Sequence, residues 1–160
     1  MSAGNFYLEP MQSYHIDHIH KIECDSFAVP WSRDSFVKEL ENPHAIYIAA
    51  AAKNRDIIGF AGMWHVVNEG HITNIAVSPE YRGIGVGDAL VSAMIQIAKD
   101  YKMIGITLEV RMGNEPAQKL YIKHGFVFEG IRKNYYTDTK EDAIVMWKRF
   151  DTNIEPEVVL

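Results

Sequence analysis

The segment from Ile72 to Ile97 constrains the fold most, because it joins a strand pattern to a helix pattern through a glycine-rich turn. Ile72 to Val77 has the pattern of a strand, Ser78 to Tyr81 breaks that pattern, and Arg82 to Gly87 leads into a helix. A glycine-rich turn in this place brings backbone N–H groups to a helix N-terminus, which favours phosphate binding. The helix has an apolar face at Val86, Leu90, Ala93 or Met94, and Ile97.

Patterns on either side predict an α/β fold with a mixed central sheet of six to seven strands and about four helices. Ile16, Ile19 and Ile22 recur at helical spacing, and Ser32 is suited to cap a second helix. Strands alternate with helices in the middle of the chain, which favours parallel pairing there, while both ends have hairpin patterns. The other expected strands are Ala45 to Ala52, Ile57 to Val67, Ile104 to Val110, Phe126 to Arg132 and Ala143 to Trp147.

The chain of 160 residues shows no repeat or linker, and we expect one domain over residues 1–150 with a tail at 151–160. Cys24 is the sole cysteine, so an intrachain disulfide is excluded. The sequence shows no signal-peptide pattern, and no apolar run approaches the roughly 20 residues of a membrane span. We therefore expect a monomeric cytoplasmic protein that does not bind membranes.

The charge is negative overall but unevenly distributed. Sixteen Lys and Arg stand against 21 Asp and Glu, and the net charge of −5 argues against direct nucleic-acid binding. Residues 82–133 nevertheless hold eight basic and five acidic residues, whereas residues 1–41 hold three basic and seven acidic ones. This division predicts a phosphate-rich cosubstrate at the basic segment and a cationic peptide at the acidic ones, unless the charges only solvate the surface.

Two common nucleotide motifs fail at the glycine-rich turn. The dinucleotide motif G-x-G-x-x-G requires glycine where Asp88 stands, and the phosphate loop of NTPases requires Gly-Lys followed by Ser or Thr. NAD and ATP are therefore disfavoured. A turn that uses its glycines only for the geometry of helix entry is the alternative.

The turn resembles one family closely, because Arg82-x-x-Gly85-x-Gly87 matches the acetyl-CoA pyrophosphate signature of the GNAT acetyltransferases. Further motifs between Phe27 and Met146 resemble the RimI branch, bacterial enzymes that acetylate the N-terminal alanine of a small-subunit ribosomal protein. These motifs are Phe27-x-x-Pro30-Trp31-Ser32, Asn74-Ile75-Ala76-Val77-x-Pro79, Leu108-Glu109-Val110-Arg111-x-x-Asn114, Leu120-Tyr121-x-x-x-Gly125-Phe126, Asn134-Tyr135-Tyr136 and Glu141-Asp142-Ala143.

The resemblance implies the GNAT fold and acetyl-CoA as cosubstrate. The strand residues Ile75, Ala76 and Val77 would pair with the pantetheine arm through their backbone. Asn114 is implied as a further coenzyme contact, although capping a short helix that ends at Gly125 is an equally natural role. The pyrophosphate would lie on Arg82, Gly83, Ile84, Gly85, Val86 and Gly87.

Glu109 and Tyr121 are implied as the catalytic residues. Glu109 lies on the second face of an apolar strand, and by resemblance it is the general base, helped if its apolar setting raises its pKa. The matching tyrosine of the family donates a proton to the CoA thiolate, so Tyr121 is the implied general acid. The alternatives are a solvated carboxylate and a core tyrosine with its hydroxyl at the rim.

Acceptor-binding residues are expected in two loops that flank the acceptor entrance in this fold. Phe27 and Trp31 fall in the first interhelical loop, and Tyr135 and Tyr136 fall in the last hairpin loop. Ordinary surface aromatics are the alternative. A slot between these loops would admit a chain terminus more easily than a lysine on a folded surface, which favours acetylation of α-amines.

Metal and thiol chemistry are disfavoured. His15 and His20 would point about 140° apart on a helix, so they do not converge on one metal ion. Cys24 has no visible partner, and we expect a packing residue rather than a nucleophile that carries the acetyl group.

The sequence therefore predicts an N-terminal protein acetyltransferase that works by direct attack in a ternary complex. An acetyltransferase for a small-molecule amine would share every coenzyme residue. A non-catalytic acyl-CoA-binding or ribosome-associated module is the alternative of another class, and the presence of both Glu109 and Tyr121 argues against it.

Overall fold

A seven-stranded sheet is the centre of the structure, a computed structural model that describes residues 5–151. The strand order is β1-β2-β3-β4-β5-β7-β6. Every neighbouring pair is antiparallel except β4 and β5, which run parallel. The strands are β1 (Phe6–Pro10), β2 (Ala45–Ala52), β3 (Ile57–Val66), β4 (Glu69–Val77), β5 (Gly105–Arg111), β6 (Val127–Arg132) and β7 (Ala143–Arg149).

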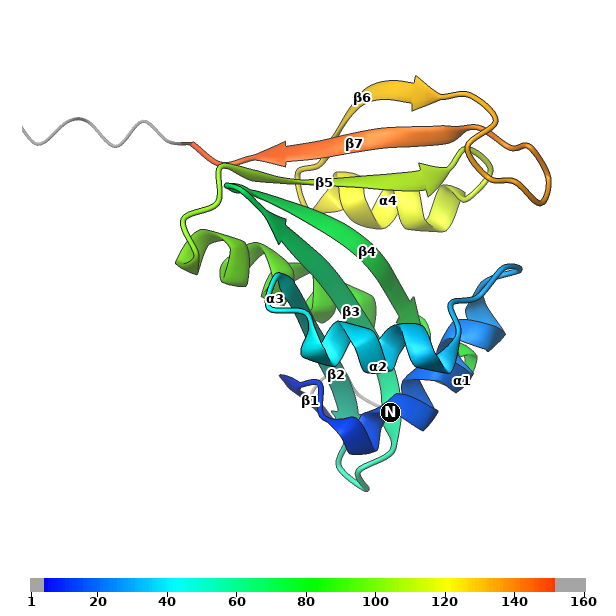
Figure 1. Cartoon of the computed structure of the whole chain (residues 1–160), viewed down its shortest axis with the longest axis vertical. Helices are drawn as coiled ribbons and strands as arrows, with labels where there is room; N and C mark the ends of the chain where they lie inside the picture. The colour runs from blue at the N-terminus through cyan, green and yellow to red at the C-terminus, as the bar shows by residue number, and fades with distance from the viewer. Residues whose placement is uncertain (1–4, 152–160) are drawn as a thin grey trace, which may run out of the picture.

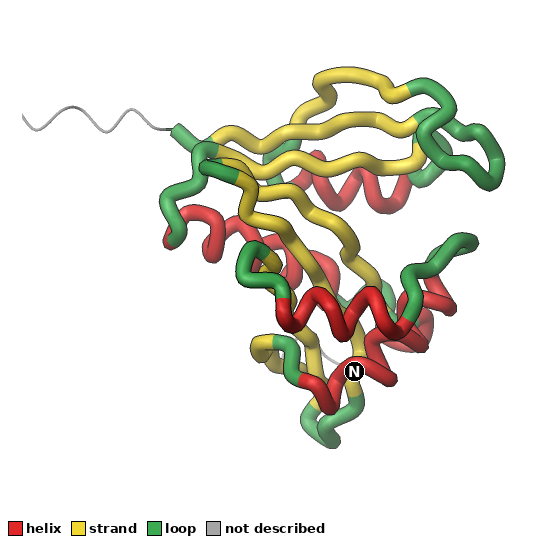
Figure 2. Tube along the Cα trace, in the orientation of Figure 1, coloured by secondary structure: helices red, strands yellow, loops and turns green. Residues whose placement is uncertain are grey.

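Helices cover both faces of the sheet (Figures 1 and 2). One face carries α1 and α2, and the other carries α3 and α4. Two short 3-10 turns, η1 and η2, precede α1 and the glycine-rich turn. The bounds are η1 (Ser13–His15), α1 (Ile16–Ser26), α2 (Arg33–Glu41), η2 (Pro79–Tyr81), α3 (Val86–Asp100) and α4 (Glu115–Lys123).

The sheet separates two hydrophobic clusters. The larger cluster packs α3 and α4 against the sheet, and the smaller one packs α1 and α2 against the opposite face. Burying one large aliphatic or aromatic side chain contributes about 1.5–3 kcal/mol, so these clusters hold the helices to the sheet. Fully buried members include Leu90, Met94, Ile106 and Leu108 of the larger cluster and Ile19, Phe36 and Phe60 of the smaller one.

Two of the predicted helices have the expected residues at their ends, a serine cap at the start of α2 and a glycine after α4. The Ser32 hydroxyl accepts a hydrogen bond from the Ser35 N–H at 3.2 Å at the start of α2. Beyond the end of α4, Gly125 has a φ of 90°, a backbone conformation that favours glycine.

The sheet opens between β4 and β5, which pair only from Glu69 to His71 and from Gly105 to Thr107. Beyond these residues the two strands diverge (Figure 1). Backbone groups along such an opening are free to bind an extended ligand arm, as a strand would. The opening therefore positions the candidate site.

A bulge in β4 decides which side chains face α1 and α2. The register against β3 shifts by one residue at Thr73, which is left without a partner. An extra residue of this kind reverses the alternation of side chains along the strand. Ile72 packs into the α3 cluster, whereas Asn74 contacts Glu23 of α1, so His71 and Asn74 share one face of the sheet.

Three element predictions need correction. Strand β1 was not predicted, because Phe6–Pro10 has no alternating pattern and ends in proline, which an edge strand tolerates. Strand β4 begins at Glu69, three residues before the predicted start at Ile72. Ile104 lies outside β5 and is exposed, although its spacing placed it in the strand.

The buried face of α3 also differs from the prediction in one position. Val86, Leu90 and Met94 are buried as expected, but Ala98 completes the face and Ile97 is only partly buried. The reason is that 3.6 residues per turn carry the stripe from Met94 to Ala98, four residues on.

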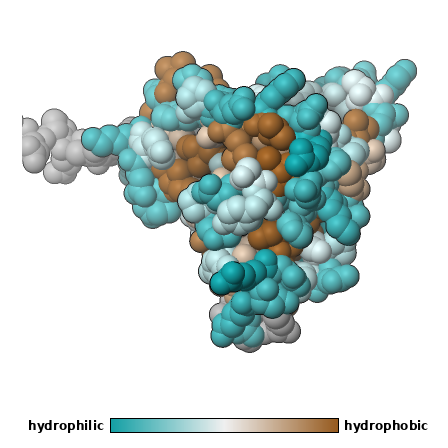
Figure 3. Space-filling view, turned by 60° about the horizontal axis from the view of Figure 1, so that its bottom comes forward, coloured by the Kyte–Doolittle hydropathy of each residue, from teal (hydrophilic) through white to brown (hydrophobic). Residues whose placement is uncertain are grey.

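No helix within residues 5–151 is long and apolar enough to cross a membrane. The face turned forward in Figure 3 mixes hydrophilic residues with hydrophobic surface that gathers near its middle. Of the predicted tail, only Asp151 lies among the described residues.

Candidate active site

A cavity of about 400 Å³ occupies the opening between β4 and β5. Residues of α1 and its following loop line it from one face of the sheet, and residues of α4 line it from the other. Its walls include eight of the sequence-predicted site residues, namely Phe27, Trp31, Ile75, Glu109, Asn114, Tyr121, Tyr135 and Tyr136. The other eight, Ala76, Val77, Arg82, Gly83, Ile84, Gly85, Val86 and Gly87, are not among the residues that line it; they end β4 and form the turn into α3.

Glu109 lies on β5 with both carboxylate oxygens engaged. His71 Nε2 donates to Oε2 at 2.7 Å, and Arg132 Nε lies 3.3 Å from Oε1. The hydrogen bond from His71 is the main cause that lowers the pKa of Glu109, and it outweighs the effect of partial burial. The apolar setting of β5 therefore does not raise the pKa of Glu109, because the apolar residues of the strand face the other side of the sheet.

Tyr121 reaches the cavity from α4, on the sheet face opposite to Glu109. Its ring packs against Phe126 with centroids 5.7 Å apart, and burial raises the pKa of its hydroxyl. The hydroxyl makes no hydrogen bond to another group within residues 5–151. A phenol with a raised pKa stays protonated at neutral pH and is available as a proton donor.

The glycine-rich turn has the backbone geometry of an anion site. Gly83 and Gly85 have φ values of 80° and 94°, which side chains rarely adopt, and Gly85 caps α3. The backbone N–H groups of Gly83, Gly85 and Gly87 donate to no protein acceptor in the described part of the chain. Arg82 Nε donates to the Val77 carbonyl at 3.1 Å, which fixes the turn against the end of β4. These free N–H groups at a helix N-terminus suit a phosphate.

Asn114 caps α4, since its Oδ1 accepts from the Ala117 N–H at 3.3 Å. The side chain is exposed and also lines the cavity. Both sequence expectations for Asn114 are therefore compatible with its position, and its coenzyme contact stays a prediction.

The loop between β6 and β7 is held over the cavity by Arg111 at the end of β5. Arg111 Nη2 donates to both carboxylate oxygens of Asp138, at 3.1 and 3.0 Å, and Nη1 lies 3.4 Å from Glu141 Oε1. The guanidinium also covers the ring of Tyr136 at 4.0 Å, and Tyr135 packs edge-on against Tyr136. The two tyrosines are thus positioned cavity residues rather than isolated surface aromatics.

Phe27 and Trp31 line the cavity from the loop between α1 and α2. Trp31 packs against Phe36 and Trp64, with ring centroids 5.7 and 6.3 Å apart. This loop and the β6–β7 loop extend on the same side of the molecule, at the right of Figure 2. Residues of both loops therefore line the cavity, and the entry of the acceptor between them stays a prediction.

Glu23 is a cavity residue that the sequence analysis missed. Its side chain, on α1, is only 2% exposed, and burial raises its pKa to about 7. It accepts hydrogen bonds of 3.4 Å from the Trp31 N–H and from Asn74 Nδ2. The signal was a carboxylate on the apolar stripe that contains Ile16 and Ile19.

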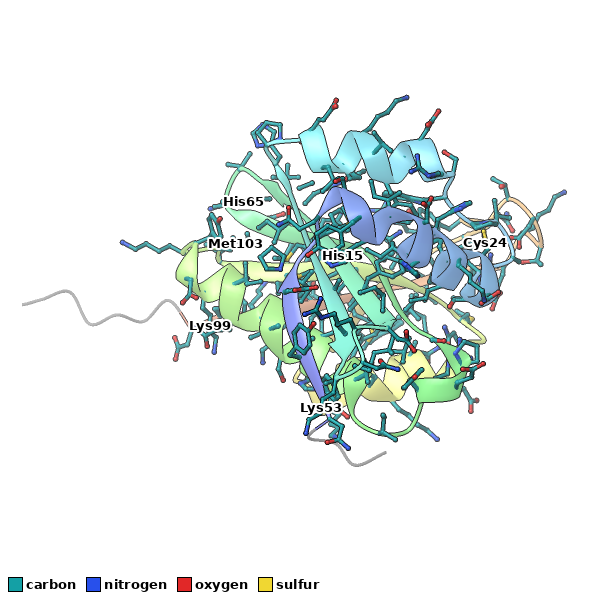
Figure 4. All side chains as sticks on the ribbon, turned by 90° about the horizontal axis from the view of Figure 1, so that it is seen from below. His15, Cys24, Lys53, His65, Lys99 and Met103 are labelled. Carbon is teal, nitrogen blue, oxygen red and sulfur yellow. The ribbon has the colours of Figure 1, made fainter. Side chains whose placement is uncertain are left out.

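Cys24 and His15 lie toward opposite ends of α1 (Figure 4). Cys24 is exposed, with Sγ 3.4 Å from His20 Nε2, so the expectation of a packing residue was wrong. It does not line the cavity, because the preceding helix residue, Glu23, takes the inward direction. His15 is fully buried and bonded to Glu9 at 2.7 Å. Within residues 5–151, no group of three or more His, Cys, Asp or Glu could hold a metal ion.

The comparison with known proteins decides the family. The sequence profile of the acetyltransferase (GNAT) family matches residues 16–126, which include α1, the opening of the sheet, the glycine-rich turn and α4. The chain belongs to the GNAT acetyltransferase family. Family membership confirms the predicted α/β GNAT fold, the enzyme class of N-acetyltransferase and acetyl-CoA as cosubstrate.

Two relatives and one solved structure that are similar to this GNAT protein have narrower names. A Bacillus subtilis (strain 168) protein, provisionally named a ribosomal protein bS18-alanine N-acetyltransferase, is 47% identical over 82% of this chain and 87% of its own length. The Escherichia coli (strain K12) protein named for the same activity is 35% identical over 79% of this chain and 86% of its own length. The crystal structure of the ribosomal-protein-S18-alanine N-acetyltransferase from Escherichia coli superposes with a TM-score of 0.85 at 29% identity, covering 94% of this chain and 97% of that one. These similarities confirm the resemblance to the RimI branch.

Proposed function

We propose that this GNAT enzyme acetylates the α-amine of a protein N-terminus, with the N-terminal alanine of ribosomal protein bS18 as its first candidate substrate. Two relatives and one solved structure that align along most of the chain are named for that activity. The structural observation that supports the proposal most is the position of Glu109 and Tyr121. They lie on opposite faces of the sheet, and both line the same cavity, which passes through the opening between β4 and β5.

Opposite faces suit the two proton transfers of the reaction. The amine nitrogen attacks the thioester carbon, the C–N bond forms, and the C–S bond then breaks. Glu109 would accept a proton from the attacking nitrogen, and Tyr121 would give one to the departing thiolate of CoA. A lowered pKa keeps Glu109 ionised as an acceptor, and a raised pKa keeps Tyr121 protonated as a donor. The direct attack requires both substrates to be bound at once.

The acetyl-CoA would approach from the glycine-rich turn. Its pyrophosphate would take hydrogen bonds from the backbone of residues 82–87, and its pantetheine arm would pair with Ile75, Ala76 and Val77 at the free edge of β4. The side chain of Val86 is buried, so this residue would act through its backbone N–H alone. Asn114 lines the cavity on the α4 side and would contact the coenzyme there.

The peptide would enter between the α1–α2 loop and the β6–β7 loop. Phe27, Trp31, Tyr135 and Tyr136 wall this end of the cavity, and a free chain terminus fits between two loops more easily than a folded surface does. Three carboxylates line the cavity. Glu109 and Asp138 are paired with Arg132 and Arg111, whereas Glu23 has no ion pair within residues 5–151 and favours a cationic amine. Such a substrate implies a cytoplasmic enzyme, and we expect it to act as a monomer without binding nucleic acid directly.

The test is acetylation of a peptide with the N-terminal sequence of bS18 by the full chain and acetyl-CoA, with the acetyl group mapped by mass spectrometry. The same peptide with a blocked N-terminus is the control. We expect the label on the α-amine of alanine and none on the blocked peptide. Label only on lysine would contradict the proposal. Small free amines acetylated in preference to the peptide would identify a small-molecule acetyltransferase instead.

A further inference from the structure

The proposed reaction removes two protons from one nitrogen, whereas Glu109 accounts for one. An α-amine titrates near 8, so at pH 7 most substrate arrives as an ammonium group with three N–H protons. The amide product keeps one of them. Tyr121 gives one proton to the CoA sulfur and is later reprotonated. Overall, R–NH₃⁺ and acetyl-CoA therefore give the amide, CoA–SH and one released H⁺.

The two proton losses differ in what they require. Removing a proton from the free α-ammonium group needs an acceptor whose pKa lies near that of the amine. After attack, the nitrogen is bonded to the former carbonyl carbon and is more acidic, so a weaker base suffices. Glu109, whose pKa is lowered by its hydrogen bond from His71, suits the second loss better than the first.

Glu23 has the surroundings of an acceptor for the first loss. Its carboxylate lines the same cavity but makes only long hydrogen bonds, 3.4 Å each, to a backbone N–H and to the Asn74 amide. No Lys, Arg or His of residues 5–151 forms an ion pair with it. A buried carboxylate without a cation is costly, and an incoming ammonium group would relieve that cost.

The bulge in β4 places the two carboxylates on the same side of the sheet. His71 and Asn74, which contact Glu109 and Glu23, are three residues apart on β4, a strand length of about 10 Å. An amine nitrogen that enters between the two loops would meet Glu23 from α1 and Glu109 from β5. We propose that Glu23 accepts the first proton from the substrate α-ammonium group, and that Glu109 accepts the second after the C–N bond has formed.

The groups facing Glu23 leave its titration free to act in catalysis. Asn74 of β4 is neutral, and Tyr47 of β2, whose pKa is raised by burial, stays protonated. The charges across the cavity are Glu109, itself bonded to His71, and Arg111, which is paired with Asp138. With a pKa of about 7, Glu23 is matched to an amine that titrates near 8.

The experiment is the pH profile of kcat/KM for the α-amine peptide between pH 6 and 9.5, in the full chain at saturating acetyl-CoA. Glu23→Gln keeps the size and the hydrogen-bonding capacity of the side chain but removes the proton acceptor. We expect a loss of about tenfold or more at pH 6.5 that shrinks to within about threefold at pH 9, where the free peptide is already neutral. Glu41→Gln, on an exposed carboxylate at the end of α2, is the matched control and should follow the wild-type profile.

A second variant separates chemistry from structure. Glu23→Asp keeps a carboxylate at the buried position, so its activity should fall while the acidic limb of its profile stays near that of the wild type. An equal loss for Glu23→Gln at every pH, or no loss at all, would overturn the inference. If Glu23→Gln fails to fold or to bind acetyl-CoA, an acidic limb shifted to higher pH in Glu23→Asp would overturn it. The inference rests on the proposed function, and the wild-type reaction tests that function separately.

Discussion

His71 Nε2, on the last paired residue of β4, donates a 2.7 Å hydrogen bond to Glu109 Oε2, two residues beyond the last paired residue of β5. The bond joins the two strands where the sheet begins to open, and it fixes one carboxylate oxygen of the candidate base. The side chain of Glu109 is 9% exposed and that of His71 is 33% exposed, so His71 is the member of the pair that solvent reaches more easily.

Stability should depend on pH through this pair. The pKa of Glu109 is lowered in the folded state, so its contribution is present above the unfolded value near 4.5 and is lost as the pH falls through the folded pKa. We expect His71→Leu to lower the free energy of unfolding by about 1.5–3 kcal/mol at pH 7 and by less at pH 3.5. Urea denaturation at both pH values measures this, with the exposed His44→Leu as control. Equal losses at both pH values would contradict the assignment.

Glu109→Gln should lower kcat for the peptide by about 10²–10⁴, since the amide cannot accept the proton. The affinity for acetyl-CoA should not change, because the turn at residues 82–87 that would hold the coenzyme is intact. Steady-state kinetics and calorimetric titration of acetyl-CoA check the two parts. Turnover at the wild-type rate would remove Glu109 from the mechanism.

Tyr121→Phe should lower kcat by about 10² while leaving the fold intact. The ring would still pack on Phe126, and the lost hydroxyl makes no hydrogen bond within residues 5–151, so we expect stability to change by less than about 1 kcal/mol. The measurements are kcat with the peptide and thermal unfolding. A large loss of stability together with unchanged kcat would show a purely structural tyrosine.

Arg111→Lys should affect the acceptor more than the coenzyme. Lysine keeps the charge but cannot bond both oxygens of Asp138 and cover Tyr136 at the same time, so the β6–β7 loop loses its anchor. We expect the KM of the peptide to rise about tenfold, equivalent to roughly 1.4 kcal/mol, with the KM of acetyl-CoA within twofold. The opposite pattern would assign the loop to coenzyme binding.

Gly105→Ala should destabilise the protein by about 2 kcal/mol or more, because overpacking against backbone atoms forces the strands apart. An added Cβ would stand 2.6 Å from the Lys148 carbonyl oxygen of β7. Gly130→Ala is the matched control on β6, where the Cβ would meet nothing within 4 Å, and it should change stability by less than about 0.5 kcal/mol. Denaturant unfolding of both variants is the test, and similar losses would contradict the expected clash.

Local signals predicted the elements that follow simple periodicities. Each of these elements depends only on residues that are close together in the chain, so it can be recognised from a single sequence. Examples are the glycine-rich turn, the amphipathic stripe of α3 and the alternation of β5. Strand β1 lacked such a signal, since it pairs only with β2 at the edge of the sheet and carries Pro10. Its existence depends on a partner more than 35 residues away in the sequence.

The residues of the candidate site could be named from the sequence, but their electrostatics could not. The motifs of the GNAT family placed Glu109, Tyr121 and the two loops, and the structure brings all of them to one cavity. The sign of the pKa shift of Glu109 could not be predicted, because it depends on His71, which is 38 residues away and reaches Glu109 only through the pairing of β4 with β5.

The sequence by itself determined the order of elements, the GNAT signature and the chemical types available for acetyl transfer. Tertiary structure alone decided which carboxylate is ionised and which is buried without a cation. Burial and charge pairing act through space, and here they depend on a three-residue strand pairing, a bulge at Thr73 and the packing of α1 over β4. The same residue type, glutamate, therefore has a lowered pKa at position 109 and a raised one at position 23.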